Sequence, residues 1–309
     1  MTILVTGHTG FVGKALVAAL SAKEVRLVGR SKLEQQSSVF FKKALDTNEQ
    51  FSDCLVGVAV VVHAAARVHV MDDTATDPLE AYRAVNVFGT LNLAKQAAAA
   101  GVKRFIFISS IKVNGEGTSL GKPYTPFDQV NASDPYGISK AEAEQALQKL
   151  ASETGMELVI IRPPLVYGLG VKANFAAMLK VAQKNLPLPL GAINNKRSIV
   201  ALDNLVDLII TCIDHPKAGN QTFLVSDDQD VSTTELLQMM TRAAGKTPWL
   251  MPVPVSWLKL AAKLAGKQAV IDRLCGNLQV DISHTKDTLG WRPPVTVEEG
   301  IARCFAAKG

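Results

Sequence analysis

Tyr136 and Lys140 stand four residues apart in the stretch PYGISK, which has the pattern of a helix start. This spacing places both side chains on one face of the helix. A phenol with a pKa of about 10 is a poor acid or base at neutral pH, but an adjacent ammonium favours the phenolate and lowers that pKa. Ser110 follows a predicted strand and is placed to hydrogen-bond the same substrate oxygen. These residues predict proton transfer at a substrate oxygen.

Three glycines near the start of the chain predict a phosphate site. Gly7, Gly10 and Gly13 follow the apolar run Ile3 to Val5 and precede a predicted helix at residues 14–20. A strand that turns through glycines into a helix leaves free N–H groups and the positive end of the helix dipole facing an anion. The alternative is a tight strand-to-helix turn without a ligand. The context favours a dinucleotide cofactor.

The end of the second predicted strand bears on the choice of cofactor. A chain that binds NAD usually offers an acid to the ribose 2′-hydroxyl about twenty residues after the glycines. Here Gly29 stands in that place and Arg30 follows, so a 2′-phosphate meets no repulsion and a guanidinium can pair with it. This favours NADP(H), with NAD(H) as the alternative. The less favoured alternative is that Arg30 is a solvated surface residue.

These groups must be positioned by alternating strands and helices. Strand patterns occur at residues 25–29, 56–66, 104–109 and 158–161, and helix patterns at 82–100 and 135–152. Strands separated by helices predict right-handed crossovers and an α/β fold, a Rossmann-type doubly wound parallel sheet. After Pro163 prolines become frequent and the rhythm weakens. We therefore predict a dinucleotide-binding domain at 1–163 and a smaller α/β substrate domain at 164–309, with 197–226 a candidate for return to the first.

The composition indicates an ordinary globular protein. Of 309 residues, 48% are hydrophobic and 20% charged, and the net charge of +5 comes without a basic cluster that would indicate nucleic-acid binding. No apolar run is long enough for a membrane span. Four widely spaced cysteines indicate buried thiols rather than disulfides or metal ligands, and we expect no metal and a cytoplasmic location: Cys54, Cys212, Cys275 and Cys304.

Residues 249–265 form an amphipathic, basic stretch, WLMPVPVSWLKLAAKLA. Such a stretch can rest on a membrane surface. More often an apolar stripe of this kind is part of a domain core, and we favour that interpretation.

Several motifs together resemble the extended short-chain dehydrogenase/reductase family. They are the glycine turn, residues 63–66, Asn86 in VNVFGT, Ser110, and the Tyr136–Lys140 pair, while RSIVALDNLVD and LGWRP match the C-terminal half of the nucleotide-sugar epimerase/dehydratase/reductase group. The similarity runs through essentially the whole chain. AARVHVMDD, ISSIKVNGEGT and RPPLVYGLGVKANF look like bacterial enzymes that reduce a UDP-4-keto-6-deoxy-N-acetylhexosamine at C4, the UDP-N-acetylquinovosamine dehydrogenase group, many of them labelled UDP-glucose 4-epimerases.

This resemblance implies roles for particular residues. Tyr136 becomes the general acid/base, Lys140 lowers its pKa and holds the nicotinamide ribose, Ser110 orients the reacting oxygen, and Asn86 supports a proton relay. Arg197 matches an arginine that meets the nucleotide diphosphate, and Asn174 is a second candidate for that contact. The implied cofactor contacts also include Gly7, Gly10, Phe11, Val12, Gly13, Asp46, Ala64, Ala65, Ala66 and Pro163.

The chain departs from the group's pattern at three places. Asn114 replaces the tyrosine of a V-Y-G segment, Leu165 stands where an asparagine usually follows the strand arginine, and NLQVD at 277–281 replaces an R-x-G-D segment. These changes affect the expected sugar and nucleotide contacts and leave the redox residues in place.

Two enzymatic hypotheses follow, and one from another class. The first is a C4 reductase of a UDP-4-keto sugar in polysaccharide biosynthesis, favoured by Gly29. The second is a UDP-hexose 4-epimerase that retains NAD. A non-catalytic NADP-binding sensor is a remote third, because Ser110, Tyr136 and Lys140 are all present. By family analogy the predicted helices at 82–100 and 135–152 would form the four-helix bundle of a homodimer.

Overall fold

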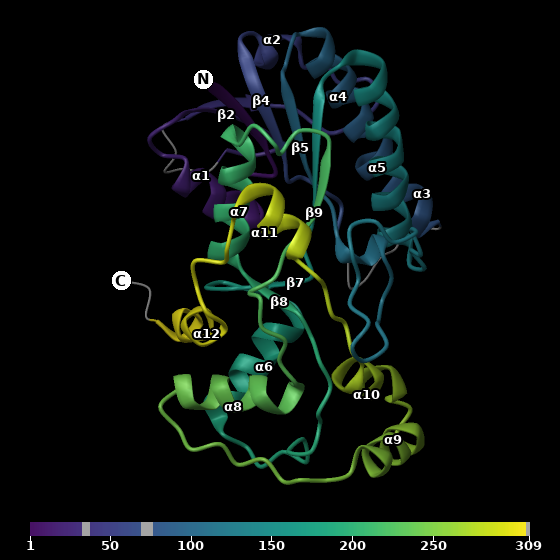
Figure 1. Ribbon diagram of the computed structural model, residues 1–309, viewed down its shortest axis with the longest axis vertical. Coiled ribbons are helices and arrows are strands. Elements are labelled where there is room, and N and C mark those ends of the chain that lie inside the picture. Colours follow the sequence, from purple (N-terminus) through teal and green to yellow (C-terminus); the bar gives the residue numbers. More distant parts are fainter. Residues whose placement is uncertain (33–37, 69–76, 307–309) are drawn as a thin grey trace.

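The computed structural model describes residues 1–32, 38–68 and 77–306. Its main element is a seven-stranded sheet in which every neighbouring pair is parallel, in the order β3-β2-β1-β4-β5-β6-β9 (Figure 1). The predicted doubly wound α/β fold is thereby confirmed. The strands are β1 (Thr2–Thr6), β2 (Glu24–Gly29), β3 (Val39–Lys42), β4 (Val58–His63), β5 (Arg104–Ile108), β6 (Glu157–Arg162) and β9 (Gln221–Leu224).

The central strands form because apolar residues there are covered on both faces. All five residues of β1 and of β5 are buried, as expected for strands inside a parallel sheet. The edge strand β3 was not predicted, because it has four residues and none of them is buried. The predicted strand at 56–66 is shorter than expected. It ends at His63, and residues 64–66 continue as loop.

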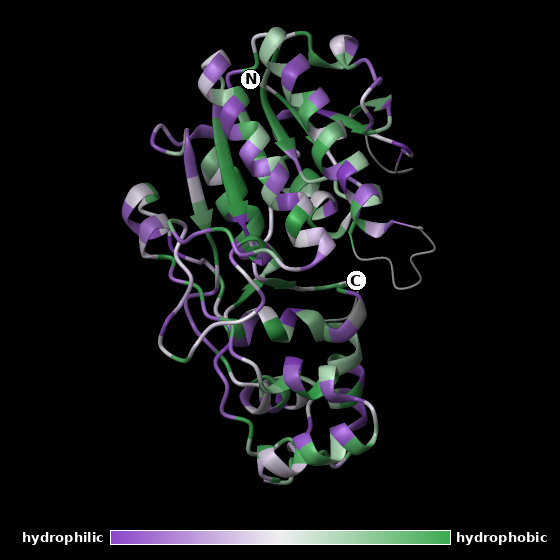
Figure 2. Ribbon diagram, turned by 90° about the vertical axis from the view of Figure 1, so that its right-hand side faces the viewer, coloured by the Kyte–Doolittle hydropathy of each residue, from purple (hydrophilic) through white to green (hydrophobic). Residues whose placement is uncertain are grey.

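Helices cover the two faces of the sheet and divide its core in two. On one face lie α1 (Phe11–Ala19), α7 (Leu202–Asp214) and α11 (Ser283–Leu289). On the other lie α2 (Ser52–Leu55), α4 (Thr90–Ala99) and α5 (Pro135–Thr154), with α3 (Pro78–Arg83) packed against α5. Figure 2 shows the apolar strands enclosed between these helices, whose polar residues face outward.

The helix predicted at 82–100 differs from the structure. It begins earlier, at Pro78, and a π-helical turn (Ala84–Gly89) separates α3 from α4. Gly89 is tightly packed there, since a Cβ at this position would lie 2.6 Å from the Leu45 carbonyl oxygen. π-Helical turns are rare and frequently occur at functional sites, and this one contains Asn86.

A smaller unit lies beyond the carboxyl ends of the strands (Figure 1). It has a two-stranded parallel sheet of β7 (Leu165–Tyr167) and β8 (Ile199–Ala201), and a core of its own. Its helices are α6 (Ala173–Lys184), α8 (Thr233–Ala243), α9 (Val255–Leu264), α10 (Gln268–Cys275) and α12 (Val297–Phe305). The chain crosses back between the units: α7 and β9 join the large sheet, and so does α11.

The structure bears on the expectation about membrane spans and on one of the motifs quoted above. Among the described residues, no helix is both long and apolar enough to cross a membrane. Part of the AARVHVMDD run falls at 69–73, outside the described residues.

Candidate active site

The glycine turn is a cradle that only glycine can form. Gly7 has a φ of +74°, and a Cβ there would lie 2.6 Å from the backbone nitrogen of Ala65. A Cβ on Gly13 would lie 2.1 Å from the Gly7 carbonyl oxygen. Gly10 caps α1 without a side-chain hydrogen bond, so the first-turn N–H groups have no side-chain acceptor from the cap. This geometry fits the pyrophosphate of a dinucleotide.

The cradle lies where the strand order reverses. β1 has β2 on one side and β4 on the other, and ligands of such sheets bind in the crevice outside this point. The predicted contacts Phe11 and Val12 open α1, and Ala64 to Ala66 follow β4. A Cβ on Gly168 in the smaller unit would lie 3.6 Å from Cζ of Phe11. The predicted cofactor residues of both strands are thus brought together here.

The end of β2 contains a residue that sequence reasoning missed. The His8 ring is buried, its Nε2 lies 3.0 Å from the Ser31 carbonyl oxygen, and it packs edge-on against Phe40. A Cβ on Gly29 would lie 2.8 Å from Cε1 of His8. Packing against His8 therefore explains why glycine stands at position 29. This weakens the inference that the missing acid indicates a preference for NADP. Arg30 is exposed just beyond the strand. The signal in the sequence that could have pointed to this contact was the bulky His8 within the glycine turn.

Asp46 was predicted to contact the cofactor, and it shapes the loop after β3. Its Oδ1 accepts hydrogen bonds from the backbone N–H groups of Asn48 and Glu49, at 2.8 and 2.9 Å. Its carbonyl oxygen accepts a hydrogen bond from the side chain of Asn92 on α4. The loop is therefore tied to the first-turn region of that helix.

Lys140 is buried at the centre of the site. Its side chain is 1% exposed, and Nζ donates a hydrogen bond of 2.7 Å to the carbonyl oxygen of Ile108 at the end of β5. Nζ also lies 4.3 Å from the centroid of the Phe107 ring, a cation–π contact. Burial lowers the pKa of Lys140 to about 7, although the nearby Glu144 carboxylate acts in the opposite direction.

Tyr136 opens α5 one turn before Lys140 and is partly buried. Its ring packs edge-on against Tyr82, with centroids 6.0 Å apart. Burial raises the pKa of the Tyr136 phenol well above its ordinary value, and the Asp134 carboxylate and the Tyr82 phenol add to the rise. The Lys140 amine is directed to the Ile108 carbonyl and is not among the causes of this shift, and its predicted effect on the phenol stays a prediction.

Asn86 is fixed by three hydrogen bonds within the π-helical turn. Its Oδ1 accepts from the Arg67 N–H at 2.8 Å, and its Nδ2 donates to the Arg67 carbonyl and to Oγ of Ser139 on α5, each at 3.0 Å. His63, between the cradle and this turn, bonds the hydroxyls of Thr6 and Thr90 at 2.9 Å each. Burial lowers its pKa to about 3, so the ring is neutral.

Ser110 begins a short turn after β5. It has extended backbone angles, and its Oγ accepts a hydrogen bond from the Lys112 N–H at 3.3 Å. The next residue, Ile111, donates its N–H to the carbonyl oxygen of Pro163 at 3.0 Å. Pro163, a predicted cofactor contact, is therefore held beside the segment that carries Ser110.

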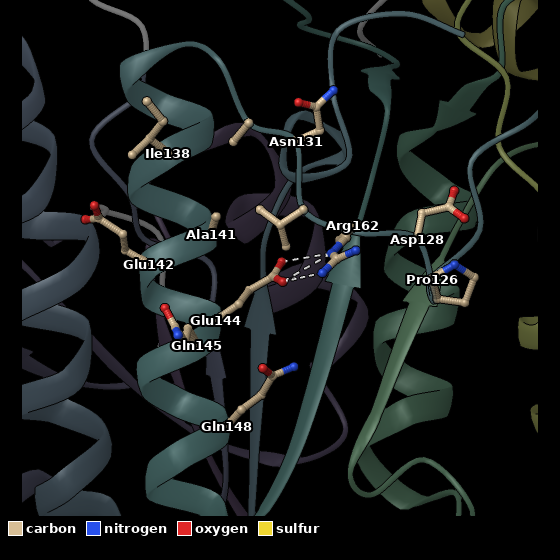
Figure 3. Close-up of a pocket in the computed structure, with 12 residues that line it drawn as sticks. Pro126, Asp128, Asn131, Ile138, Ala141, Glu142, Glu144, Gln145, Gln148 and Arg162 are labelled. Atoms are coloured by element: carbon tan, nitrogen blue, oxygen red, sulfur yellow. Dashed lines mark hydrogen bonds and ion pairs between the residues drawn. The ribbon is translucent and has the colours of Figure 1, made fainter. Parts of the chain in front are cut away.

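A buried carboxylate joins the three segments that carry these groups. Glu144 on α5 accepts two hydrogen bonds from Nε of Arg162 and one of 2.5 Å from its Nη2, as Figure 3 shows. The Ser109 hydroxyl also donates to Glu144, and Arg162 Nη1 donates to Oδ1 of Asn114 at 3.0 Å. Sequence analysis missed this network, although Tyr136, Lys140 and Glu144 recur every four residues.

The network gives one of the sequence departures a structural role. Asn114, where the family pattern has tyrosine, is buried and donates its Nδ2 to the Thr125 carbonyl at 3.0 Å. It therefore connects the loop after β5 to Arg162 at the end of β6. The pair of Glu144 and Arg162 also lines a cavity of about 670 Å³ between α5 and residues 126–132 (Figure 3).

The two predicted substrate residues lie in the smaller unit. The Arg197 guanidinium donates to the carbonyls of Arg273 and Gly276, at 2.9 and 3.3 Å, at the negative end of the α10 dipole. Burial lowers its pKa. Asn174 is exposed in the first turn of α6. Among the described residues, neither side chain hydrogen-bonds Tyr136 or Ser110, and the contact of Arg197 and Asn174 with a nucleotide remains a prediction.

Comparison with known proteins agrees with the fold. The sequence profile of the NAD dependent epimerase/dehydratase family matches residues 3–226. A Vibrio cholerae protein named UDP-glucose 4-epimerase is 54% identical, over 99% of this chain and 95% of its own length.

Solved structures share the fold across the whole chain. The UDP-glucose 4-epimerase of Thermotoga maritima with UDP-glucose has a TM-score of 0.77 at 22% identity, covering 98% of this chain and 97% of its own. The UDP-glucuronic acid 4-epimerase of Bacillus cereus in complex with NAD has a TM-score of 0.78 at 20% identity, with the same coverage.

The buried ion pair predicts a large loss of stability when one partner is removed. Glu144→Gln leaves the Arg162 charge buried without a counter-ion, so we expect the free energy of unfolding to fall by about 3–5 kcal/mol. Glu142→Gln is the matched control, because Glu142 pairs with Arg83 where both side chains are about one-third exposed, and we expect a loss below about 1 kcal/mol. Urea denaturation measures both. Equal losses in the two variants would contradict the account.

The buried lysine predicts a pH dependence of stability. The folded pKa of about 7 lies below the ordinary 10.5, so between these values the unfolded chain binds a proton that the folded chain does not. Stability contributed by this site should therefore rise with pH across that window, by up to about 1.4 kcal/mol per pH unit. Urea midpoints from pH 7 to pH 10 for wild type, Lys140→Met and the exposed-site control Lys95→Met test this. Parallel profiles for wild type and Lys140→Met would refute it.

Proposed function

The chain belongs to the NAD dependent epimerase/dehydratase family, and we propose that it is a nucleotide-sugar oxidoreductase that acts at C4 of a UDP-hexose, as a UDP-hexose 4-epimerase. The observation that carries the proposal is the placement of Tyr136, Lys140 and Ser110 around the end of β5, beside the glycine cradle. The 54% identity to a protein named UDP-glucose 4-epimerase supports the substrate class.

The proposed roles are those that the family resemblance implies for these residues. Oη of Tyr136 takes the proton of the C4 hydroxyl and returns it. The Ser110 hydroxyl donates a hydrogen bond to the same oxygen and so holds it toward the phenol. Lys140 holds the ribose next to the nicotinamide, and Asn86 fixes the start of α5 through Ser139. When bound, the oxidised nicotinamide supplies the acceptor for the hydride that leaves C4 of the sugar, and it supplies a positive charge. That charge opposes the rise in the pKa of the Tyr136 phenol.

The substrate's diphosphate is assigned to the smaller unit. Arg197 is the candidate for pairing with it, and Asn174 is the second candidate. Arg197 would exchange its two carbonyl acceptors at the end of α10 for phosphate oxygens, which as charged acceptors make stronger hydrogen bonds. This assignment rests on the family pattern and on the partial burial of the Arg197 side chain.

A net C4 reductase of a UDP-4-keto-6-deoxy-N-acetylhexosamine is the second candidate. The observation that favours it is Arg30, which is exposed beside Gly29 at the end of β2, where residues 28–32 contain no acidic side chain. A reductase exchanges its cofactor in each cycle, and the guanidinium would select NADPH. The same proposal includes a role in polysaccharide biosynthesis and a homodimer that forms through α4 and α5. Phe88, next to α4, is an exposed apolar residue available for that contact.

The first test removes the proposed proton carrier. Tyr136→Phe should lower kcat for interconversion of UDP-glucose and UDP-galactose by about 10²- to 10⁴-fold, because general acid/base catalysis contributes that much. Cofactor binding should persist. Tyr124→Phe is the control, because the Tyr124 hydroxyl donates its hydrogen bond to the Gly117 carbonyl, outside the proposed catalytic group. An undiminished kcat of Tyr136→Phe would contradict the role of Tyr136 as proton carrier. An unaltered cellular phenotype of Tyr136→Phe with cofactor bound would instead support the non-catalytic sensor.

The second test separates epimerase from reductase. The epimerase proposal predicts that the purified chain retains NAD and interconverts UDP-hexoses without net change in nicotinamide absorbance. The reductase proposal predicts consumption of NADPH with a UDP-4-keto sugar, and a loss of NADPH affinity of about 10- to 100-fold in Arg30→Ala from removal of charge-assisted hydrogen bonds. NADH preference together with epimerisation would reject the reductase.

A further inference from the structure

The end of the smaller unit farthest from the seven-stranded sheet carries a surface where large apolar side chains are exposed next to lysines. It is formed by α9, by α10, and by the segment at 244–254 that leads into α9 (Figure 1). The sequence analysis favoured a domain core for residues 249–265. That interpretation is wrong, because only Leu258 and Ala262 of α9 are buried.

The exposed apolar residues of α9 form one stripe. Trp257, Leu260 and Leu264 are 71%, 61% and 83% exposed. Their spacing of three and four residues places them on one face of the helix, opposite the face through which Leu258 and Ala262 pack. Trp249 and Met251, in the preceding segment, are 59% and 43% exposed. Exposed side chains of this size rarely gather in such a stripe without a partner.

The stretch of chain that contains this stripe carries most of the net charge. Residues 246–273 contain five basic residues and one acidic residue, a balance of +4, while the whole chain has +5. The basic residues are Lys246, Lys259, Lys263, Lys267 and Arg273, and the acidic one is Asp272. In the portion of the chain that the structure describes, no ion pair neutralises Lys259, Lys263 or Lys267. Lys259 and Lys263 lie along one side of the apolar stripe on α9.

We propose that α9 binds the surface of an anionic lipid bilayer, with Trp257, Leu260 and Leu264 inserted at the interface and the lysines directed to the headgroups. A helix with an apolar stripe bordered by lysines is suited to this position, and tryptophan favours the headgroup level. Anionic headgroups complement the lysines beside the stripe, whereas a second copy of this chain would bring the same positive charge to it. The proposal does not depend on the enzymatic function proposed above.

The test uses the full chain with vesicles of phosphatidylcholine, with or without phosphatidylglycerol, in a flotation assay at several salt concentrations. We expect binding only to the anionic vesicles, and weakening as salt rises. Trp257→Ser/Leu260→Ser/Leu264→Ser and Lys259→Gln/Lys263→Gln should each lower the partition coefficient by about tenfold or more. The matched controls are Leu120→Ser/Val130→Ser, exposed apolar residues elsewhere, and Lys95→Gln/Lys103→Gln, exposed lysines on the large unit.

Folding and alternative occupants are controlled in the same experiment. The urea midpoint and epimerisation rate of the α9 variants should equal those of wild type, because none of these residues belongs to the proposed active site. Absence of binding to anionic vesicles, or equal binding by all variants, overturns the proposal. The proposal is also overturned if the wild type is a dimer, the triple serine variant is a monomer, and neither binds vesicles. The stripe would then be covered by a second copy of the chain.

Discussion

The arrangement of the site depends on one buried carboxylate. Glu144 is held by Arg162 from the end of β6 and by Ser109 from the end of β5, and it stands one helical turn after Lys140 on α5. Three segments that come from distant parts of the chain are thereby fixed at one point. Such a pair is costly to bury, and its retention in a core fits a role in orienting the segments that carry Ser110, Tyr136 and Lys140.

The same burial sets the electrostatics of the two titrating groups. Burial lowers the pKa of Lys140, although a backbone carbonyl and an aromatic face are its close partners, and burial raises the pKa of the Tyr136 phenol. Both shifts favour neutral forms. Proton transfer by Tyr136 therefore requires additional positive charge at the site, and the oxidised nicotinamide is the group that would bring it.

The sequence predicted those features whose cause lies within a short stretch. The strand–helix rhythm, the glycine turn and the four-residue spacing on α5 are local, and the structure contains each of them. The edge strand β3 was missed because it is short and lacks a buried face. The position of His8 over Gly29 and the network around Glu144 join residues far apart in the chain, which periodicity alone does not reveal. For α9 the pattern gave the amphipathic faces correctly but not which face is covered.

The central claim is that the carbon-bound hydrogen at C4 leaves the sugar and returns within the site. A UDP-hexose carrying deuterium at C4 measures this directly, with the product analysed by mass spectrometry and NMR. We predict an epimer that retains the deuterium at C4, formed without added cofactor and without incorporation of solvent hydrogen at carbon. Release of the label to water, or no change of configuration at C4, would contradict the account.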